Sequence, residues 1–286
     1  MSKIAIVTDS SVSPTEELAE KYQVEVVPVN ILFEGKVYRD WVDLTPTQAY
    51  QFLEKNPKEF STSAPPPDGF LSAYRRIAER GTEEILCLTI PAQLSATYNS
   101  ARMASNLAKT EFPQLRIEVI DSGTVGAGET LLILAAARAI ETGKSLDEVI
   151  QLIDSFKKKV RVFFLLETIR YIYRSGRVPE VASKLGALLS IKPILTIHEG
   201  KFHFVEATIS KQKGVEKLLR ILRENLDQNL PEIGIMHADC LKEAEELKEK
   251  IIQQFSSAKI FISEFSPVMG YAFGRGTLLT AFYFKD

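Results

Sequence analysis

The sequence EILCLTI at residues 84–90 is a nearly continuous apolar run that ends at Pro91. Such a run is typical of a β-strand that is buried on both faces of a parallel sheet. From about Ala96 the following segment carries Ala, Met and Leu at helical spacing as far as Ala108. A buried strand followed closely by a helix predicts one βα unit of a parallel sheet.

The same alternation of strand and helix extends through the first half of the chain. The strand-like runs are residues 3–8, 24–33 and 115–120. The helical patterns are residues 14–22, 45–55, 69–79, 128–142 and 145–158. This rhythm predicts a parallel, doubly wound sheet. We therefore expect an N-terminal α/β domain over residues 1–160.

The second half of the chain carries a different pattern. Residues 194–197 and 201–207 are strand-like and are separated by His198-Glu199-Gly200, which predicts an antiparallel β-hairpin. Further strands are expected at residues 160–166, 232–236, 259–264 and 277–284, and helices at residues 211–225 and 242–255. We expect a second α/β domain with a mixed sheet over residues 161–286, and hence a two-domain α/β fold.

Composition excludes several classes of protein. The 286 residues are 45% hydrophobic, and 35 Lys and Arg balance 37 Asp and Glu to a net charge of −2, so no basic field favours nucleic acid. Two distant cysteines, Cys87 and Cys240, indicate structural thiols in a reducing compartment. Residues 4–7 form a strand with no apolar leader before it, and no apolar stretch is long enough to span a bilayer. We expect a cytoplasmic protein without a transmembrane segment.

Two hydroxyl-rich segments lie next to expected helix starts. Ser95 falls near the N-terminus of the helix at residues 96–108, where free backbone N–H groups attract anions. In the segment STSAPPP at residues 61–67, the hydroxyls of Thr62 and Ser63 precede three prolines that stiffen the chain. Together the two segments predict a cradle for a small anionic head group. The alternatives are that Ser95 only caps its helix and that residues 61–67 are a rigid connector.

Similar polar residues end the neighbouring strands. Asp9-Ser10-Ser11 follows the strand at residues 3–8, and Asp121-Ser122 follows the strand at residues 115–120. Ligands of parallel sheets gather beyond the carboxyl ends of the strands. These side chains could therefore share one crevice with Ser95.

The known catalytic and cofactor motifs fit this chain poorly. The glycines of residues 123–128 have the order G-x-x-G-x-G, which differs from the dinucleotide fingerprint. No phosphate-binding loop and no clustered Cys/His set occurs, so we expect neither a cofactor nor a metal. His237 is the one candidate base, and Ser95 lacks the elbow of a nucleophilic serine. We assign no catalytic residue; an acyl- or phosphoryl-transfer enzyme using Ser95 or His237 is the alternative.

The segment SPVMGYAFGRG at residues 266–276 mixes glycines with aromatic residues before the last expected strand. Glycines at such a place allow a ligand or another part of the chain to approach the backbone closely. Gly270 and Arg275 are therefore candidate ligand contacts. The alternative interpretation is a turn with packing aromatic side chains.

Several motifs together resemble the DegV family, the fatty-acid-binding proteins that act as FakB subunits of bacterial fatty acid kinase. The resemblance spans nearly the whole chain. In chain order the motifs are Ile6 to Ser10, Thr62-Ser63 with Pro65, Leu94 to Ala101, Asp121-Ser122, Ser175-Gly176-Arg177, Lys192-Pro193, His237-Ala238-Asp239 and Gly274-Arg275-Gly276.

This resemblance implies a two-domain α/β protein that buries one long-chain fatty acid between its domains. Hydroxyls matching Thr62 and Ser95 would hold the carboxylate, and Ser63, Gly270 and Arg275 complete our candidate ligand-binding set. A separate ATP-dependent kinase would then phosphorylate the bound acid, so the chain itself would be a non-catalytic, lipid-binding subunit. A third option is a regulatory role in which the lipid is only a signal. The apolar residues 131–139, 163–166 and 185–194 either line a tunnel or form the core.

The sequence departs from the family pattern at some positions. Ala64, Ala96 and Ser175 replace residues that are usually Gln, Gly and Gly, and Ala272 stands where the final segment usually carries His. We expect Arg275, which replaces a Pro, to supply charge in place of that His. We also expect Arg170, Arg174 and Arg177 to form an exposed basic surface that docks the kinase; the alternative is a solvated face.

Overall fold

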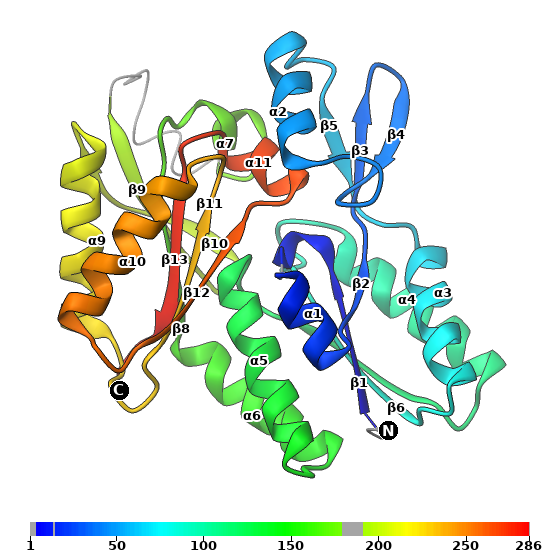
Figure 1. Ribbon diagram of the computed structural model, residues 1–286. Helices are drawn as coiled ribbons and strands as arrows, with labels where there is room; N and C mark the ends of the chain where they lie inside the picture. The colour runs from blue at the N-terminus through cyan, green and yellow to red at the C-terminus, as the bar shows by residue number, and fades with distance from the viewer. Residues whose placement is uncertain (1–3, 14, 179–190, 286) are drawn as a thin grey trace.

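The computed structural model describes residues 4–13, 15–178 and 191–285, and Figure 1 shows two main sheets with helices between and around them. The first sheet is parallel throughout. Its spatial order is β2 (Glu25–Val27), β1 (Ile4–Asp9), β6 (Glu84–Thr89) and β7 (Arg116–Asp121). Strand β6 is buried on both faces, which explains its continuous apolar run. The parallel sheet expected in the N-terminal half is confirmed.

Two helices, α3 (Pro67–Glu79) and α4 (Thr97–Glu111), cover one face of this sheet. The side chains of Phe70 and Tyr74 on α3 are fully buried and share a cluster with Ile85 and Cys87 of β6. The short helices η1 (Ser10–Val12) and α1 (Glu16–Tyr22) follow β1. Because α3 begins at Pro67, the last of three consecutive prolines, the hydroxyl segment before these prolines is held at one end of the sheet.

A third, smaller sheet was not foreseen from the sequence. Its antiparallel order is β4 (Lys36–Arg39), β3 (Asn30–Phe33) and β5 (Ser61–Ser63), and α2 (Pro46–Lys55) accompanies it. The single strand expected at residues 24–33 is wrong, because Pro28 lacks an N–H group and separates β2 from β3. Likewise, residues 61–63 form the edge strand β5 and not a loop.

The second main sheet is mixed, as expected. Its spatial order is β10 (Lys201–Thr208), β9 (Lys192–His198), β8 (Val160–Leu165), β13 (Leu278–Tyr283), β11 (Glu232–His237) and β12 (Lys259–Glu264). Neighbouring strands are antiparallel except β11 and β12, which are parallel. Strands β9 and β10 are the expected hairpin. Helices α9 (Lys211–Asn225) and α10 (Leu241–Gln254) cover one face.

Helices α5 (Ala127–Glu141) and α6 (Leu146–Lys159) lie between the two main sheets (Figure 1). Helix α5 is apolar nearly all round and almost completely buried, because it contacts β1 and β6 on one side and β8, β11 and β13 on the other. A Cβ atom on Gly128 would come within 2.5 Å of the Val162 side chain, so glycine is needed where α5 meets β8. Since α5 contacts both sheets, a domain division at residue 160 stays a prediction.

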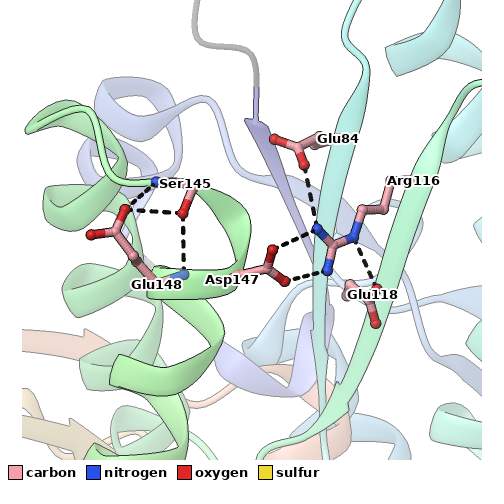
Figure 2. Close-up of polar contacts among 6 residues, drawn as sticks. All are labelled: Glu84, Arg116, Glu118, Ser145, Asp147 and Glu148. Carbon is pink, nitrogen blue, oxygen red and sulfur yellow. Dashed lines mark hydrogen bonds and ion pairs between the residues drawn. The ribbon is translucent and has the colours of Figure 1, made fainter.

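An ion-pair network fastens α6 to the parallel sheet (Figure 2). Arg116 of β7 pairs with Asp147 in the first turn of α6 (Nη2–Oδ1 2.6 Å) and with Glu118 on its own strand (Nε–Oε1 3.1 Å). The same turn is closed by a capping box between Ser145 and Glu148. These groups are exposed, so the network sets the position of α6 more than it adds stability.

Two further short helices, α7 (Arg170–Arg174) and α11 (Pro267–Phe273), lie close together at the end of the molecule that also holds α2 (Figure 1). The alternative interpretation of residues 266–276 as a turn is wrong for residues 267–273, because the Ser266 hydroxyl accepts a hydrogen bond from the Met269 N–H and a helix starts there. Gly274, at φ +81°, ends it. In the described part of the chain, no helix is long and apolar enough to cross a membrane.

Candidate ligand-binding site

A cavity of about 410 Å³ lies where α11, the start of α4 and the strand β5 meet. Residues 268–273, except Gly270, form one wall. Residues 62–64 and residues 94–97 form the opposite parts of the lining. We expected these last two segments to form one cradle, and the structure brings them together.

Most of the cavity wall is apolar. Ile172 of α7, Phe202 of β10, Val268 and Phe273 contribute side chains to it. The Phe273 ring stacks on the Phe164 ring, with ring centroids 4.3 Å apart, and this contact holds Phe273 in position. This wall therefore offers a hydrocarbon chain a preformed apolar surface.

Most of the polar side chains that line the cavity carry hydroxyl groups. Thr62, Ser63, Ser95, Thr97 and Ser11 all line it. The Oγ of Ser95 lies 2.8 Å from Oγ1 of Thr97 and accepts a bond from the Thr97 N–H at 3.3 Å. Ser95 therefore bridges the first turn of α4 without being its N-cap, which is Ala96. The interpretation of Ser95 as the helix cap is therefore wrong, and its side chain lies in the cavity lining, as the ligand-binding interpretation requires.

Arg177 is the only charged side chain among the described residues that line the cavity. Its Nη2 donates to Oγ1 of Thr62 at 3.5 Å, its Nε to the Leu94 carbonyl at 3.3 Å and its Nη1 to the Ser175 carbonyl at 2.9 Å. The sequence analysis expected Arg177 on an exposed surface, but it is half-buried, because these three acceptors hold it against the cavity. Whether it also docks a partner stays a prediction.

The other two arginines of that prediction lie outside the cavity lining. Arg170 is exposed, whereas Arg174 is half-buried. The Arg174 guanidinium lies 5.3 Å from the ring centroids of both Tyr171 and Tyr271. Two of its nitrogens, Nε and Nη2, are buried and have no hydrogen-bond partner within the described residues.

Gly270 and Arg275 also lie outside the described lining of the cavity. Gly270 is where α11 approaches α2, since an added Cβ would lie 2.8 Å from the Tyr50 hydroxyl. Arg275 pairs with Glu54 of α2 (Nη1–Oε1 2.7 Å) and with Asp239 (Nε–Oδ2 2.9 Å, an ion pair without hydrogen-bond geometry). Its charge is thus already balanced by two carboxylates, in place of the head-group role that we expected.

Asp40, which the sequence analysis did not single out, holds the cavity wall in place. Its buried carboxylate accepts bonds from the Ser10 hydroxyl at 2.6 Å and from the Val268 N–H at 3.1 Å. Burial raises the pKa of Asp40 to about 7. A buried carboxylate that joins η1 to the first turn of α11 therefore positions the residues that line the cavity. In the sequence, Asp40 belongs to no recognisable motif and is marked only by its position directly before the single tryptophan, Trp41.

Asp9 performs a similar task at the end of β1. One of its oxygens accepts from the Ser11 N–H at 3.0 Å and the other from the Ile90 N–H at 2.9 Å, and both Ser11 and Ile90 line the cavity. Burial raises the pKa of Asp9, and burial together with the charge of Asp9 raises that of Glu129 on α5. The Asp121 carboxylate, in contrast, accepts hydrogen bonds from the Ala92 and Gly123 N–H groups, and none of these three residues lines the cavity.

The candidate base of the enzyme alternative, His237, lies outside the cavity lining. None of the three histidines lines the cavity, so Ser95 has no imidazole beside it there. His237 is buried at the end of β11, and burial lowers its pKa. Among the described residues, no group of three or more His, Cys, Asp or Glu could hold a metal ion.

The apolar stretches proposed as a tunnel lining lie elsewhere. Residues 131–139 belong to the buried helix α5, and residues 163–166 belong to β8 and its end. Neither stretch is part of the cavity lining. Of residues 185–194, the part up to residue 190 lies outside the described residues. The described part of the lining comes mainly from α7, α11, β5, β10, the start of α4 and the strand ends.

The fold and the cavity define an α/β protein that encloses an apolar space with hydroxyls and one arginine in its wall. The chain belongs to the DegV family: the family described as "Uncharacterised protein, DegV family" matches residues 3–285. A DegV domain-containing protein of Clostridium acetobutylicum is 29% identical over 279 residues, which are 97% of this chain and 98% of the relative.

Solved structures share the whole fold. A DegV family protein of Thermus thermophilus, reported for its fatty acid binding, is 28% identical with a TM-score of 0.85, and the match covers 98% of this chain and 99% of that one. A DegV family protein of Eubacterium eligens, loaded with heptadecanoic acid, is 25% identical with a TM-score of 0.88, and the match covers 99% and 100% of the two chains. These matches confirm the two-sheet α/β architecture.

Proposed function

We propose that this protein binds one long-chain fatty acid in the cavity, with the carboxylate beside Thr62, Ser95 and Arg177. The observation that carries the proposal is the distribution of groups: apolar walls, several hydroxyls and a single cation that contacts one of those hydroxyls. An amphiphile with one negative charge matches this distribution. The solved relatives that carry fatty acids support the same ligand class.

The tail supplies most of the affinity in this proposal. At about 0.8 kcal/mol per buried methylene, a tail of roughly fourteen methylenes offers on the order of 11 kcal/mol before the costs of association. Hydrogen bonds to a charged carboxylate contribute about 1.5 to 3 kcal/mol each. The hydroxyls and Arg177 therefore set the register and the chemical class of the ligand.

We further propose that the bound acid is presented to a separate fatty acid kinase in the cytoplasm. The resemblance to FakB subunits supports this step, and so do the basic residues next to the cavity. Arg170 and Tyr173 are exposed on α7, the helix that also contributes Ile172 to the cavity wall. An acidic surface of the kinase would complement this helix.

A cavity-filling substitution tests the fatty acid site. Ala272 lines the cavity, so Ala272→Trp should occupy the space of the tail. Titration of delipidated protein with palmitate should give one site per chain in the wild type and at least a thirtyfold weaker affinity in this variant. Ala92→Trp is the matched control, because Ala92 is exposed and lies outside the described lining. Equal palmitate affinity of all three proteins would refute the proposed site.

A further inference from the structure

A second cavity, of about 650 Å³, lies between the C-terminal end of α6 and the turn of the β9–β10 hairpin. None of its described lining residues also lines the first cavity. The Gly200 N–H of the hairpin turn donates to the Gly123 carbonyl at 3.1 Å and ties this turn to the segment after β7. Elements of both main sheets therefore form this space, which we call the interface pocket. Its described lining consists of residues 122–124, Asp154, Lys157, Lys158, Val160, Arg161 and residues 197–199.

Two neighbouring lysines of α6 line the interface pocket without a carboxylate partner. Lys157 is half-buried, and a Cβ atom added to Gly123 would lie 3.9 Å from its Cε. Neither Lys157 nor Lys158 forms an ion pair within the part of the chain that the structure describes. The next residue, Lys159, does pair with Asp227 (Nζ–Oδ2 3.9 Å), and it lies outside the described lining. The unpaired positive charges of this helix end are thus the ones at the pocket.

The third cation of the pocket, Arg161, is half-buried and also has no ion pair among the described residues. Its Nη1 donates to the carbonyls of Lys158 and Val160, each at 2.8 Å, which leaves Nε and Nη2 for a ligand. Burial lowers the pKa of Arg161, whereas hydrogen-bonded carboxylates raise the pKa of Arg116 and Arg138. An anion in the pocket would supply the counter-charge that Arg161 lacks.

Two carboxylates, Asp154 and Glu199, and the exposed imidazole of His198 also line the pocket. Neither carboxylate forms an ion pair with a basic side chain among the described residues. The charge of Glu199 raises the pKa of Arg161 by less than burial lowers it. The pocket therefore has three cations against two carboxylates, and no direct contact within the described residues neutralises these cations.

We propose that the interface pocket binds the diphosphate group of a small water-soluble metabolite, with Lys157, Lys158 and Arg161 as its cations. The oxygens of two linked phosphates can bridge the lysines at the end of α6 and the guanidinium at the start of β8. Arginine binds phosphate oxygens with a planar pair of donors, and lysine binds them as a point charge. A volume of about 650 Å³ also accommodates an organic group attached to the diphosphate. This site does not depend on the proposed fatty acid function.

Isothermal titration calorimetry with inorganic pyrophosphate tests the site. The wild type should bind one pyrophosphate per chain, with an affinity that falls as salt rises. The double change Lys157→Gln with Lys158→Gln should weaken this affinity by about tenfold or more, whereas Asp154→Asn, which removes a repelling charge, should strengthen it roughly threefold. The matched control is Lys58→Gln with Lys109→Gln, which removes the same charge from two exposed lysines outside the described linings of both cavities.

The opposite charge changes keep the test independent of folding defects. No binding by the wild type, or equal affinity of the wild type and the Lys157→Gln, Lys158→Gln variant, would overturn the site. An Asp154→Asn protein that binds pyrophosphate more weakly than the wild type would contradict it as well. Palmitate should bind all of these proteins equally, so loss of the fatty acid site would leave this result unchanged.

Two further ligands identify the chemistry of the anion. ADP that binds more tightly than pyrophosphate, with the same sensitivity to the lysine changes, would support a nucleotide as the source of the diphosphate. Equal affinity for ADP and pyrophosphate would support recognition of the diphosphate alone. Citrate carries three carboxylates and no phosphate, and citrate binding as tight as that of pyrophosphate would overturn the assignment to a phosphate ligand.

Discussion

Arg177→Met is the substitution that probes the head-group end of the cavity most sharply. Methionine keeps an unbranched apolar side chain but removes the guanidinium that donates to Thr62. The acid would then retain hydroxyl and backbone donors and lose its only cation in the described lining.

The expected loss can be estimated from the burial of this side chain. An ion pair at about 4 Å contributes roughly 4 kcal/mol at an effective dielectric constant of about 20, which is an upper bound for a half-buried group. A hydrogen bond to a charged group contributes about 1.5 to 3 kcal/mol. We therefore expect a loss of about 2 kcal/mol, which corresponds to a roughly thirtyfold weaker affinity for palmitate.

Isothermal titration calorimetry with two ligands makes this prediction specific. Palmitate should bind Arg177→Met about thirtyfold more weakly than the wild type, and the deficit should shrink as salt rises. Hexadecanol, which has the same tail without a charge, should bind both proteins within threefold. Equal losses for acid and alcohol would show that Arg177 only shapes the cavity, and no loss for either would refute the head-group assignment.

Three further predictions concern the hydroxyls, the buried carboxylate and the approach of α11 to α2. The double change Thr62→Ala with Ser95→Ala should weaken palmitate binding more than tenfold in a fluorescence displacement assay; unchanged binding would remove both residues from the site. For Asp40, the folded-state pKa of about 7 lies above the usual value of 3.8, so its contribution to stability is fully present below about pH 4 and is lost as pH rises through 7. Urea unfolding should therefore show that the free energy of unfolding of the wild type relative to Asp40→Asn falls between about pH 4 and pH 7, and a constant difference would contradict this. Gly270→Ala should lower the free energy of unfolding by about 1 to 3 kcal/mol, because the new methyl group meets Tyr50; an unchanged urea midpoint would show that α11 shifts freely.

The sequence predicts the two main sheets because their strands carry strong patterns. The run at residues 84–90 is buried on both faces, and the hairpin at residues 194–207 has a turn with Glu199 and Gly200 at positive φ. The small antiparallel sheet escapes prediction, because β5 is a three-residue strand of Ser and Thr whose pairing partner lies thirty residues earlier. Only tertiary contact makes that segment a strand.

The residues of the candidate site also fall into two groups, those that local sequence motifs predict and those whose role depends on contacts with distant parts of the chain. Thr62 and Ser95 lie in local motifs at helix starts, so the sequence points to them directly. The inward placement of Arg177 depends on the Leu94 carbonyl, which is 83 positions earlier, and the role of Asp40 depends on Val268, which is 228 positions later. No local sequence pattern contains contacts between residues so far apart in the chain. Composition and spacing therefore predicted that Arg177 would be exposed on the surface with Arg170 and Arg174.

Native mass spectrometry of the protein purified from a bacterial host tests the central claim most directly. The account predicts that the wild-type chain carries one additional mass that matches a long-chain fatty acid, released on denaturation, and that Ala272→Trp carries none. A folded wild-type protein free of lipid, even after incubation with excess palmitate, would contradict the account, and so would an Ala272→Trp protein that retains the same fatty acid.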